Sequence, residues 1–580
     1  MTITPKSLFP PLPATARAQA AQLAYDVKNN RVAYPNGKSI VVRPLASSDP
    51  TDTIQFTGHI YNTTAAAFSP SGNYIASGDA NGNLKIWSAE KLSQTFERPP
   101  IKSEFQVLSG PVRAITWDAD GTRIIAVGEG KEKFGHCFSW DSGNSIGDIQ
   151  GHAATVTGVD IRQQRPYRAA TVSEDKAMVF FNGPPFKFDK SVRGHHTNSI
   201  QAVKFSPDGT HLVSVGSDRQ IVLYDGKTGE YLKATPAHQG GIYGVSWRDS
   251  NTFVTASADN TVKVWNSQLE CLKTIDMPSS GSVAQQVAIV ASEDQIITFS
   301  VDGTINVVKE DGISTIYGHQ GQITSVTENI SASSDGSIIK WNGPEAVVAG
   351  SHSGYVCSIV SDSANYYSAG WDDKVKKWQD GKLVGEVQLD SQPKQLILRN
   401  KLTVVFESKV EIYDLDLKKE HSNDLGFSTN GGDISENGLI LTTSNTVKNI
   451  ETGKESAPLR AAPTLIRVSP NGEHIAVADS AGKYTLYDSN FNVVTTRWAY
   501  HSSRVLDAQW TSDSKYLASG GLDSGIFIYS VDRPSKVLKF PLAHQNGVTA
   551  IGWANYGDSD STLVSGGADG AIKRWSVSFA

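Results

Sequence analysis

The sequence predicts an all-β fold, two seven-bladed β-propellers in tandem, and three observations lead to this prediction. The chain has 580 residues, which is too long for one hydrophobic core. A short motif recurs fourteen times along it. Apolar and polar residues alternate with a period of two, and helical spacing is confined to one short stretch, 14–22. Because propellers have about four to eight blades, fourteen repeats divide most naturally into seven and seven.

The recurring motif is a small residue, an Asp, a short turn, an alternating apolar run and an aromatic. Clear copies are SADNTVKVWN, SSDGSIIKWN, GADGAIKRWS and GSDRQIVLYD. The fourteen copies end at Val42, Trp87, Trp140, Phe181, Tyr224, Trp265, Val308, Trp341, Trp378, Tyr413, Ile450, Tyr487, Tyr529 and Trp575. A repeat of about 40–45 residues with four strands is typical of the WD-repeat propeller blade.

A Gly-His or related pair precedes many copies of the motif. The pairs are Gly58-His59, Gly151-His152, Gly194-His195, Ala237-His238, Gly318-His319, Tyr500-His501 and Ala543-His544. We expect the turn Asp to bond this His, and a strand Ser or Thr to link the His to the Trp indole. His238, Asp259 and Trp265 form one such set. This hydrogen bonding accounts for most His and Asp residues, so we expect no catalytic residue and no metal site.

The spacing of the repeats also predicts the domains. We place the first propeller at 15–317 and the second at 318–580. After Trp575 only SVSFA remains, which is too short for the outer strand of the last blade. The segment Thr2 to Phe9 precedes the first blade and has no other evident role. We therefore predict that residues 2–9 supply the missing strand and close the second propeller.

Composition argues against several classes of function. The net charge of −6 at pH 7 argues against a nucleic-acid-binding surface. No apolar run approaches the roughly 18 residues of a membrane span, and no secretory signal is visible. Cys137, Cys271 and Cys357 show no CxxC spacing, which favours reduced thiols and a cytoplasmic location. No nucleophile elbow or phosphate loop is present, so we expect neither an enzyme nor a bound cofactor.

Two neighbouring repeats break the pattern. In the third, the short turn is replaced by the loop GEGKEKFG, which carries Glu129 and Lys133. The interpretations are a tolerated insertion or a contact surface. In the fourth, Phe186 and Phe188 follow a Gly-Pro-Pro turn, and they either pack onto the blade or anchor a partner. In a later repeat, Trp371 replaces the small residue before the turn Asp.

These two segments carry a family resemblance. The start SLFPPLPATARAQ, the loop GEGKEKFGHCF and the segment NGPPFKF resemble the actin-interacting protein 1 family over essentially the full chain. The resemblance implies binding to actin filaments together with ADF/cofilin, at cortical actin structures. It implies disassembly of cofilin-decorated filaments by severing and barbed-end capping, without covalent chemistry. It points to Glu132, Glu174 and Phe188 as contacts, and Glu129, Lys133 and Phe186 lie beside them in the same two segments.

This chain departs from the family at two places. Glu174 stands where the family commonly has Asp, and the polar stretch Thr197-Asn198-Ser199 replaces an aromatic that some members carry after the blade His. Two alternatives to the actin interpretation stay open. One is a WD-repeat scaffold in another multiprotein complex. The other is an enzyme that uses a propeller channel, which would need a cluster of His, Asp or Glu outside the repeat positions.

Overall fold

The computed structural model describes residues 1–45, 52–90, 98–131, 133–343, 345–362, 364–557 and 561–579. In this part of the chain the regular structure is β-strand apart from one short 3₁₀ helix, η2 (Ser282–Ala284). The described strands form fourteen antiparallel sheets, thirteen with four strands and one with three. The all-β, fourteen-bladed prediction is therefore confirmed. None of the described helical structure has the length and apolar character needed to cross a membrane.

We number the sheets as blades 1 to 14 in chain order. The blades are β2–β5 (24–56), β6–β9 (63–106), β10–β13 (112–148), β14–β17 (156–192), β18–β21 (200–236), β22–β25 (242–276), β26–β29 (286–316), β30–β33 (323–351), β34–β37 (356–388), β38–β41 (395–424), β42–β44 (432–449), β45–β48 (463–495), β49–β52 (505–540) and β53–β55 (548–578), the last completed by β1 (Thr2–Phe9).

Blade 6 shows how the sequence forms one unit. Its strands are β22 (Ile242–Trp247), β23 (Thr252–Ser257), β24 (Thr261–Asn266) and β25 (Cys271–Asp276). The first three are largely buried and β25 is exposed, so the first strand lies inside and the fourth at the rim. The turn between β23 and β24 places Asn260 at φ 67°, a left-handed conformation that Asn and Gly adopt most easily.

The first compact unit along the chain spans Leu12–Ile316 and contains blades 1 to 7. Its core lies between neighbouring blades, because each sheet buries both faces against the next. One apolar cluster joins blade 7 to blade 1, with Val287 and Phe299 packed near Val32 and Tyr34. This contact closes the ring after seven blades.

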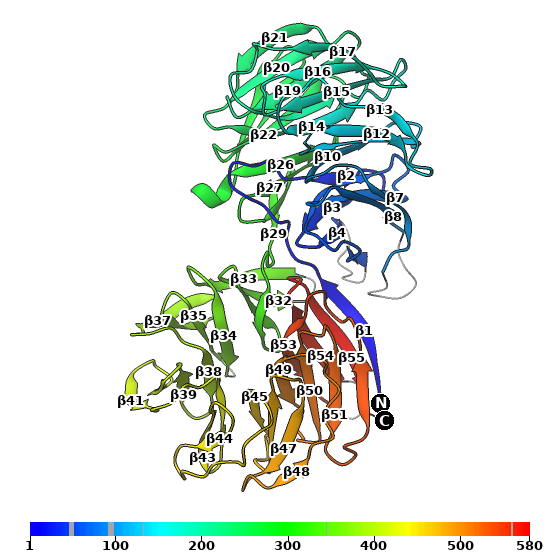
Figure 1. The fold of residues 1–580 in the computed structure, drawn as a ribbon. Helices are drawn as coiled ribbons and strands as arrows, with labels where there is room; N and C mark the ends of the chain where they lie inside the picture. Colours follow the sequence, from blue (N-terminus) through cyan, green and yellow to red (C-terminus); the bar gives the residue numbers. More distant parts are fainter. Residues whose placement is uncertain are drawn as a thin grey trace. The chain divides into compact units, whose positions relative to one another are not determined.

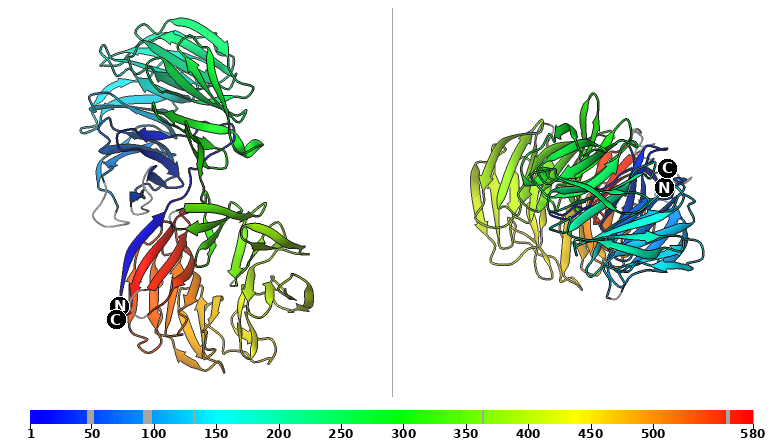
Figure 2. Two further views of the ribbon diagram at one scale, coloured as in Figure 1. Left: turned by 180° about the vertical axis from the view of Figure 1, so that it is seen from behind. Right: turned by 90° about the horizontal axis from the view of Figure 1, so that it is seen from above.

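The second unit contains Tyr317–Ala580 together with Met1–Pro11. Strand β1 pairs antiparallel with β55 (Ile572–Ser578), from Thr2 opposite Ser578 to Phe9 opposite Ile572. Figure 1 shows β1 in dark blue along the red β55, and Figure 2 shows the two ends of the chain side by side there. An apolar cluster containing Phe9 joins blade 14 to blade 8, so the first residues of the chain help to close the second ring.

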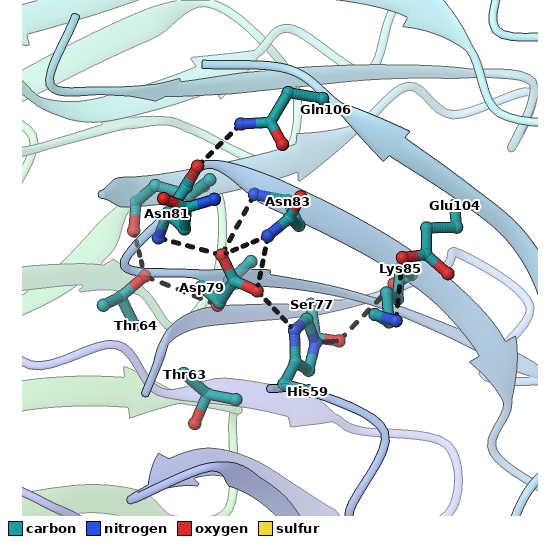
Figure 3. A network of polar contacts seen from close by, with 12 residues as sticks. His59, Thr63, Thr64, Ser77, Asp79, Asn81, Asn83, Lys85, Glu104 and Gln106 are labelled. Atoms are coloured by element: carbon teal, nitrogen blue, oxygen red, sulfur yellow. Dashed lines mark hydrogen bonds and ion pairs between the residues drawn. The ribbon is translucent and has the colours of Figure 1, made fainter. Parts of the chain in front are cut away.

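Repeated hydrogen bonds occupy the His, Asp and Trp positions. In blade 6, His238 Nδ1 lies 2.9 Å from Asp259, its Nε2 lies 2.7 Å from Thr255, and the Trp265 indole donates to Thr255 at 2.9 Å. Burial opposes ionisation of Asp259, but hydrogen bonds from His238 and Thr261 hold its pKa well below the usual range. Figure 3 shows the corresponding network of blade 2 around His59 and Asp79. These residues stabilise the blades.

Three details of the repeat differ from the sequence-based expectation. The blade His of the fifth repeat is His196, which contacts Asp218 at 2.9 Å, whereas His195 stacks on Tyr231. His352 also occupies a blade position, 2.8 Å from Asp372. In blade 5 the repeat aromatic Tyr224 pairs with Leu212, the second residue of the second strand. The residue that pairs with the corresponding Ile124 in blade 3 is Phe138, so Phe138 is the repeat aromatic there and Trp140 lies two residues beyond it. Sequence spacing alone does not fix such one- or two-residue shifts.

Candidate interaction surface

The long loop of blade 3 joins β11 (Arg123–Gly128) to β12 (Gly135–Ser139). Its first residue is tied to the blade, because Glu129 N donates to the Pro111 carbonyl at 3.0 Å and Arg113 Nε contacts the Glu129 carboxylate at 3.2 Å. Lys131 N donates to Ser109 at 3.2 Å. Glu132 lies outside the described residues.

The far side of this loop carries a second charge cluster. Lys133 Nζ lies 2.7 Å from Asp148 Oδ2, and His136 Nδ1 lies 3.0 Å from the other oxygen. The hydrogen bond from Lys133, followed by that from His136, lowers the pKa of Asp148. Asp148 therefore stays ionised and holds Lys133 at the exposed edge of β13 (Ser145–Asp148). Neither His136 nor Asp148 stood out in the sequence, because neither occupies a repeat position.

The two aromatics of blade 4 have different environments. Phe186 is 2% exposed and belongs to the apolar cluster between blades 3 and 4, where Phe134 of the long loop also packs. A Cβ added at Gly183 would lie 2.5 Å from the Phe186 ring, so that glycine allows the ring to pack down. The expectation that Phe186 contributes to a contact surface is not met in this conformation, since the core already covers its ring.

Phe188 is the exposed member of the pair. It lies in β17 (Lys187–Val192), the rim strand of blade 4, and is 50% exposed. Its ring meets Phe181 edge-on at 6.4 Å and covers Gly151, where an added Cβ would approach it to 2.7 Å. One face of Phe188 is therefore held by the blade, and the other is free to contact a partner.

Glu174 lies directly before the turn Asp of blade 4. Its backbone N donates to the Thr155 carbonyl at 3.1 Å, while Asp175 is held by His152 at 3.2 Å. Blades 5, 6, 8 and 14 carry the small residues Ser217, Ala258, Ser334 and Ala568 at this position. Glu174 is exposed, and no ion pair links its carboxylate to another described residue. The blade needs a backbone N–H here but no carboxylate.

These residues gather on two adjacent blades. The loop that carries Glu129 and Lys133 and the turn that carries Glu174 both connect the second and third strands of their blades, so they lie on the same face of the propeller. Phe188 lies on the rim strand of blade 4. Glu129 and Lys133 already have partners within blade 3, so Glu174 and Phe188 are the members most available for binding.

The neighbouring blade 5 adds a feature that the motif search missed. His195 stacks on Tyr231 with the ring centres 3.7 Å apart and the planes at 3°. Tyr231 and Leu232 are 42% and 50% exposed. The polar stretch after the blade His begins with Thr197, whose N donates to Asp218 at 2.8 Å. The doubled His after Gly194 was the available signal, since only one of two adjacent His residues can take the blade position.

Comparison with known proteins agrees with this architecture. The family described as WD domain, G-beta repeat matches residues 50–88, 186–225, 229–266, 492–530 and 534–576. The matches fall in both propellers and define the chain as a WD-repeat protein.

Full-length relatives identify the family. The chain is 32% identical to actin-interacting protein 1 of Drosophila melanogaster, over 99% of this chain and 98% of the relative. It is 32% identical to WD repeat-containing protein 1 of Gallus gallus and 34% identical to a WD repeat-containing protein of Schizosaccharomyces pombe, each over 99% of both chains. The protein belongs to the actin-interacting protein 1 family, whose members are also named WD repeat-containing protein 1.

Proposed function

We propose that the protein binds actin filaments decorated with ADF/cofilin and promotes their disassembly by severing and by capping barbed ends. The observation that carries this proposal is the departure of blades 3 and 4 from the repeat, which leaves Glu174 and Phe188 exposed at positions that the blade does not require. The name of the Drosophila relative, an actin-interacting protein, supports the choice of partner. The proposed location is the cytoplasm, at cortical actin structures.

The proposed contact combines an apolar anchor with charge. Phe188 supplies a rigid aromatic surface, and exposed aromatics that a partner covers contribute strongly to binding. Glu174 supplies a carboxylate that can pair with a basic group of cofilin or of cofilin-bound actin. Glu129 and Lys133 extend the same surface, and Glu132, which lies outside the described residues, is included on the family resemblance alone. Phe186 belongs to the apolar cluster against which Phe134 of the long loop packs.

The proposed action needs no covalent step. A protein that binds the cofilin-altered filament better than the bare filament shifts the equilibrium toward the altered state in proportion to that difference. The two propellers also lie in one chain, so a contact by each would act together with a high effective concentration. Both effects favour broken filaments over intact ones.

Co-sedimentation tests the proposal directly. Actin filaments with and without cofilin are mixed with wild-type protein or with the double variant Glu174→Arg, Phe188→Ala. We expect wild-type protein to move actin into the supernatant only when cofilin is present. We expect the double variant to need about 10–100-fold more protein for the same effect, which corresponds to loss of one anchor and one charge contact.

A matched control uses exposed residues of other blades in the same propeller. Leu272 lies on the rim strand of blade 6 and is 56% exposed, and Glu310 is an exposed carboxylate in blade 7. The double variant Leu272→Ala, Glu310→Arg should disassemble filaments like wild type. Equal activity of the Glu174 and Phe188 variant and the wild-type protein would refute the site, and absence of any cofilin-dependent effect of wild type would refute the function.

A further inference from the structure

Trp371 of blade 9 occupies the same repeat position as Glu174 of blade 4. It precedes the turn residue Asp372, and its backbone N donates to the Tyr355 carbonyl at 2.8 Å. The indole is 55% exposed and stacks on the Tyr355 ring, with the centres 4.5 Å apart and the planes at 28°. The blade network is complete without it, since His352 already contacts Asp372. The indole therefore has no structural role that the blade requires.

A cavity of about 750 Å³ lies beside this aromatic pair. It is lined by residues from blades 9, 10, 11 and 13, among them Lys394, Asn430 and Arg504. The same three residues also line a second hollow of about 610 Å³ along the inner strands, so the cavity is the mouth of the central channel of this propeller. Its size lies in the range of about 300–1,000 Å³ that is usual for ligand sites.

Among the described residues, the hollow in the channel of the first propeller is smaller. Its volume is about 90 Å³, and the segment 20–23 forms part of its lining. That segment is fixed to an inner strand, because Ala21 N donates to the Val287 carbonyl at 2.9 Å. The protein's own chain thus forms part of the wall of the smaller hollow, whereas the larger cavity of the second propeller leaves room for an external ligand.

Of the described residues, three with cationic side chains line the cavity, and two of them already have carboxylate partners. Its lining includes Lys394, Lys409 and Arg504 and the single carboxylate Glu407. Lys394 donates to the Thr429 carbonyl at 2.9 Å. Lys409 lies 3.0 Å from a Glu411 oxygen. Arg504 is exposed, and within the described part of the chain its guanidinium has no hydrogen bond or ion pair. A cation without a partner in the mouth of a cavity is suited to bind a carboxylate.

We propose that this cavity binds an extended acidic peptide segment of a partner protein, with an apolar side chain on Trp371 and Tyr355 and a carboxylate on Arg504. A peptide that places one carboxylate on Arg504 fits better than a nucleic acid, because Lys394 and Lys409 are already paired with Glu407 and Asp390 and leave one free cation among the described lining residues for a continuous phosphate backbone. The proposal does not rest on the actin-directed function, since it assigns a separate site on the other propeller.

Peptide binding to the full-length protein tests the site. The probes are fluorescein-labelled decapeptides that contain one Phe or Leu together with Asp and Glu. The set covers every distance along the peptide between the apolar residue and the acidic residues. The comparison probes are the same set with Lys and Arg in place of the acids, and a labelled oligouridylate. By fluorescence anisotropy, we expect acidic members to bind and the two comparison sets not to bind, with an affinity that falls as salt is added.

Two variants locate the binding. Trp371→Ala and Arg504→Glu should each weaken the best acidic peptide by about tenfold or more. The protein itself carries Ala at the position of Trp371 in blades 6 and 14, so this substitution fits the turn. Arg460→Glu, at an exposed Arg of the same propeller that lines neither hollow, is the matched control and should bind as wild type.

Three results would overturn the proposal. The first is that no acidic peptide binds more tightly than about 1 mM. The second is that binding survives unchanged in both variants. The third is that oligouridylate binds more tightly than every acidic peptide. Filament disassembly by the Trp371→Ala variant is measured in parallel, so a failure of this site is distinguished from a failure of the blade 3 and 4 surface.

Discussion

Replacement of Phe9 by Ala tests how the second propeller is closed. Phe9 is 4% exposed, and its ring lies 4.8 Å from Trp341 of blade 8, with the Arg574 guanidinium 5.1 Å from its centre. Replacing a buried Phe by Ala in such a core lowers the free energy of unfolding by about 3–5 kcal/mol. This cost is the sum of the lost transfer free energy of the ring and the free energy of the cavity that remains. Because the cluster spans blades 14 and 8, we expect the full cost to fall on the second propeller.

Hydrogen exchange followed by mass spectrometry locates this loss. In the Phe9→Ala variant, amides of β1, of β53–β55 and of blade 8 should exchange faster, because local opening of the ring becomes easier. Amides of blades 1 to 7 should keep their wild-type rates. In thermal unfolding, the Phe9→Ala substitution should lower the midpoint temperature of the transition of the second propeller. The transition of the first propeller should keep its wild-type midpoint.

A matched substitution in the other propeller supplies the control. Phe56 of blade 1 is fully buried and stacks on Trp87 of blade 2 at 4.3 Å. Phe56→Ala should produce the mirror result, with faster exchange confined to the first propeller. Faster exchange of blades 1 to 7 in the Phe9 variant, or unchanged exchange of blade 14, would refute the closure by β1.

Two further predictions concern titratable groups. Burial lowers the pKa of His319 to about 4, so its stabilising contribution is complete above about pH 6.5 and falls as the pH drops toward 4. Between pH 7 and pH 5 the free energy of unfolding should fall by about 2 kcal/mol because of His319. The denaturant midpoint of a His319→Gln variant should therefore fall less steeply over this pH range than that of the wild-type protein. An equally steep fall in both proteins would contradict the role given to His319. Cys271 is exposed and should react with Ellman's reagent in the native protein, whereas burial raises the pKa of Cys137 to about 12, so Cys137 should react only after unfolding. Fast native reaction of Cys137 would contradict its burial.

Much of the fold could be predicted because its determinants are local. The turn Asp, the alternating strand and the terminal aromatic lie within about ten residues of one another, and short-range hydrogen bonds and period-two burial act over that distance. The sequence-based prediction failed where two nearby residues could occupy the same repeat position. Two adjacent His residues, His195 and His196, compete for one blade position, and only the neighbouring Asp218 and Ser214 decide between them.

The candidate site was less predictable, because exposure depends on neighbouring blades. Phe186 and Phe188 look alike in the sequence, but Phe186 enters the cluster shared by blades 3 and 4 while Phe188 stays half exposed. Trp371 is visible in the sequence as an irregular residue. Its stacking on Tyr355, and the position of both beside Arg504, arise only when separate blades meet around the channel.

The sequence by itself therefore determined the blade as a unit, the number of blades and the residues that hold each one together. The tertiary structure decided which irregular residues remain at the surface and which side chains meet at the mouth of the second channel. The physical reason is the range of the interactions. A blade is specified by hydrogen bonds and alternation within about 40 residues. The surface and the channels depend on contacts between blades, and the last blade is completed by β1, whose Thr2 pairs with Ser578 at the opposite end of the chain.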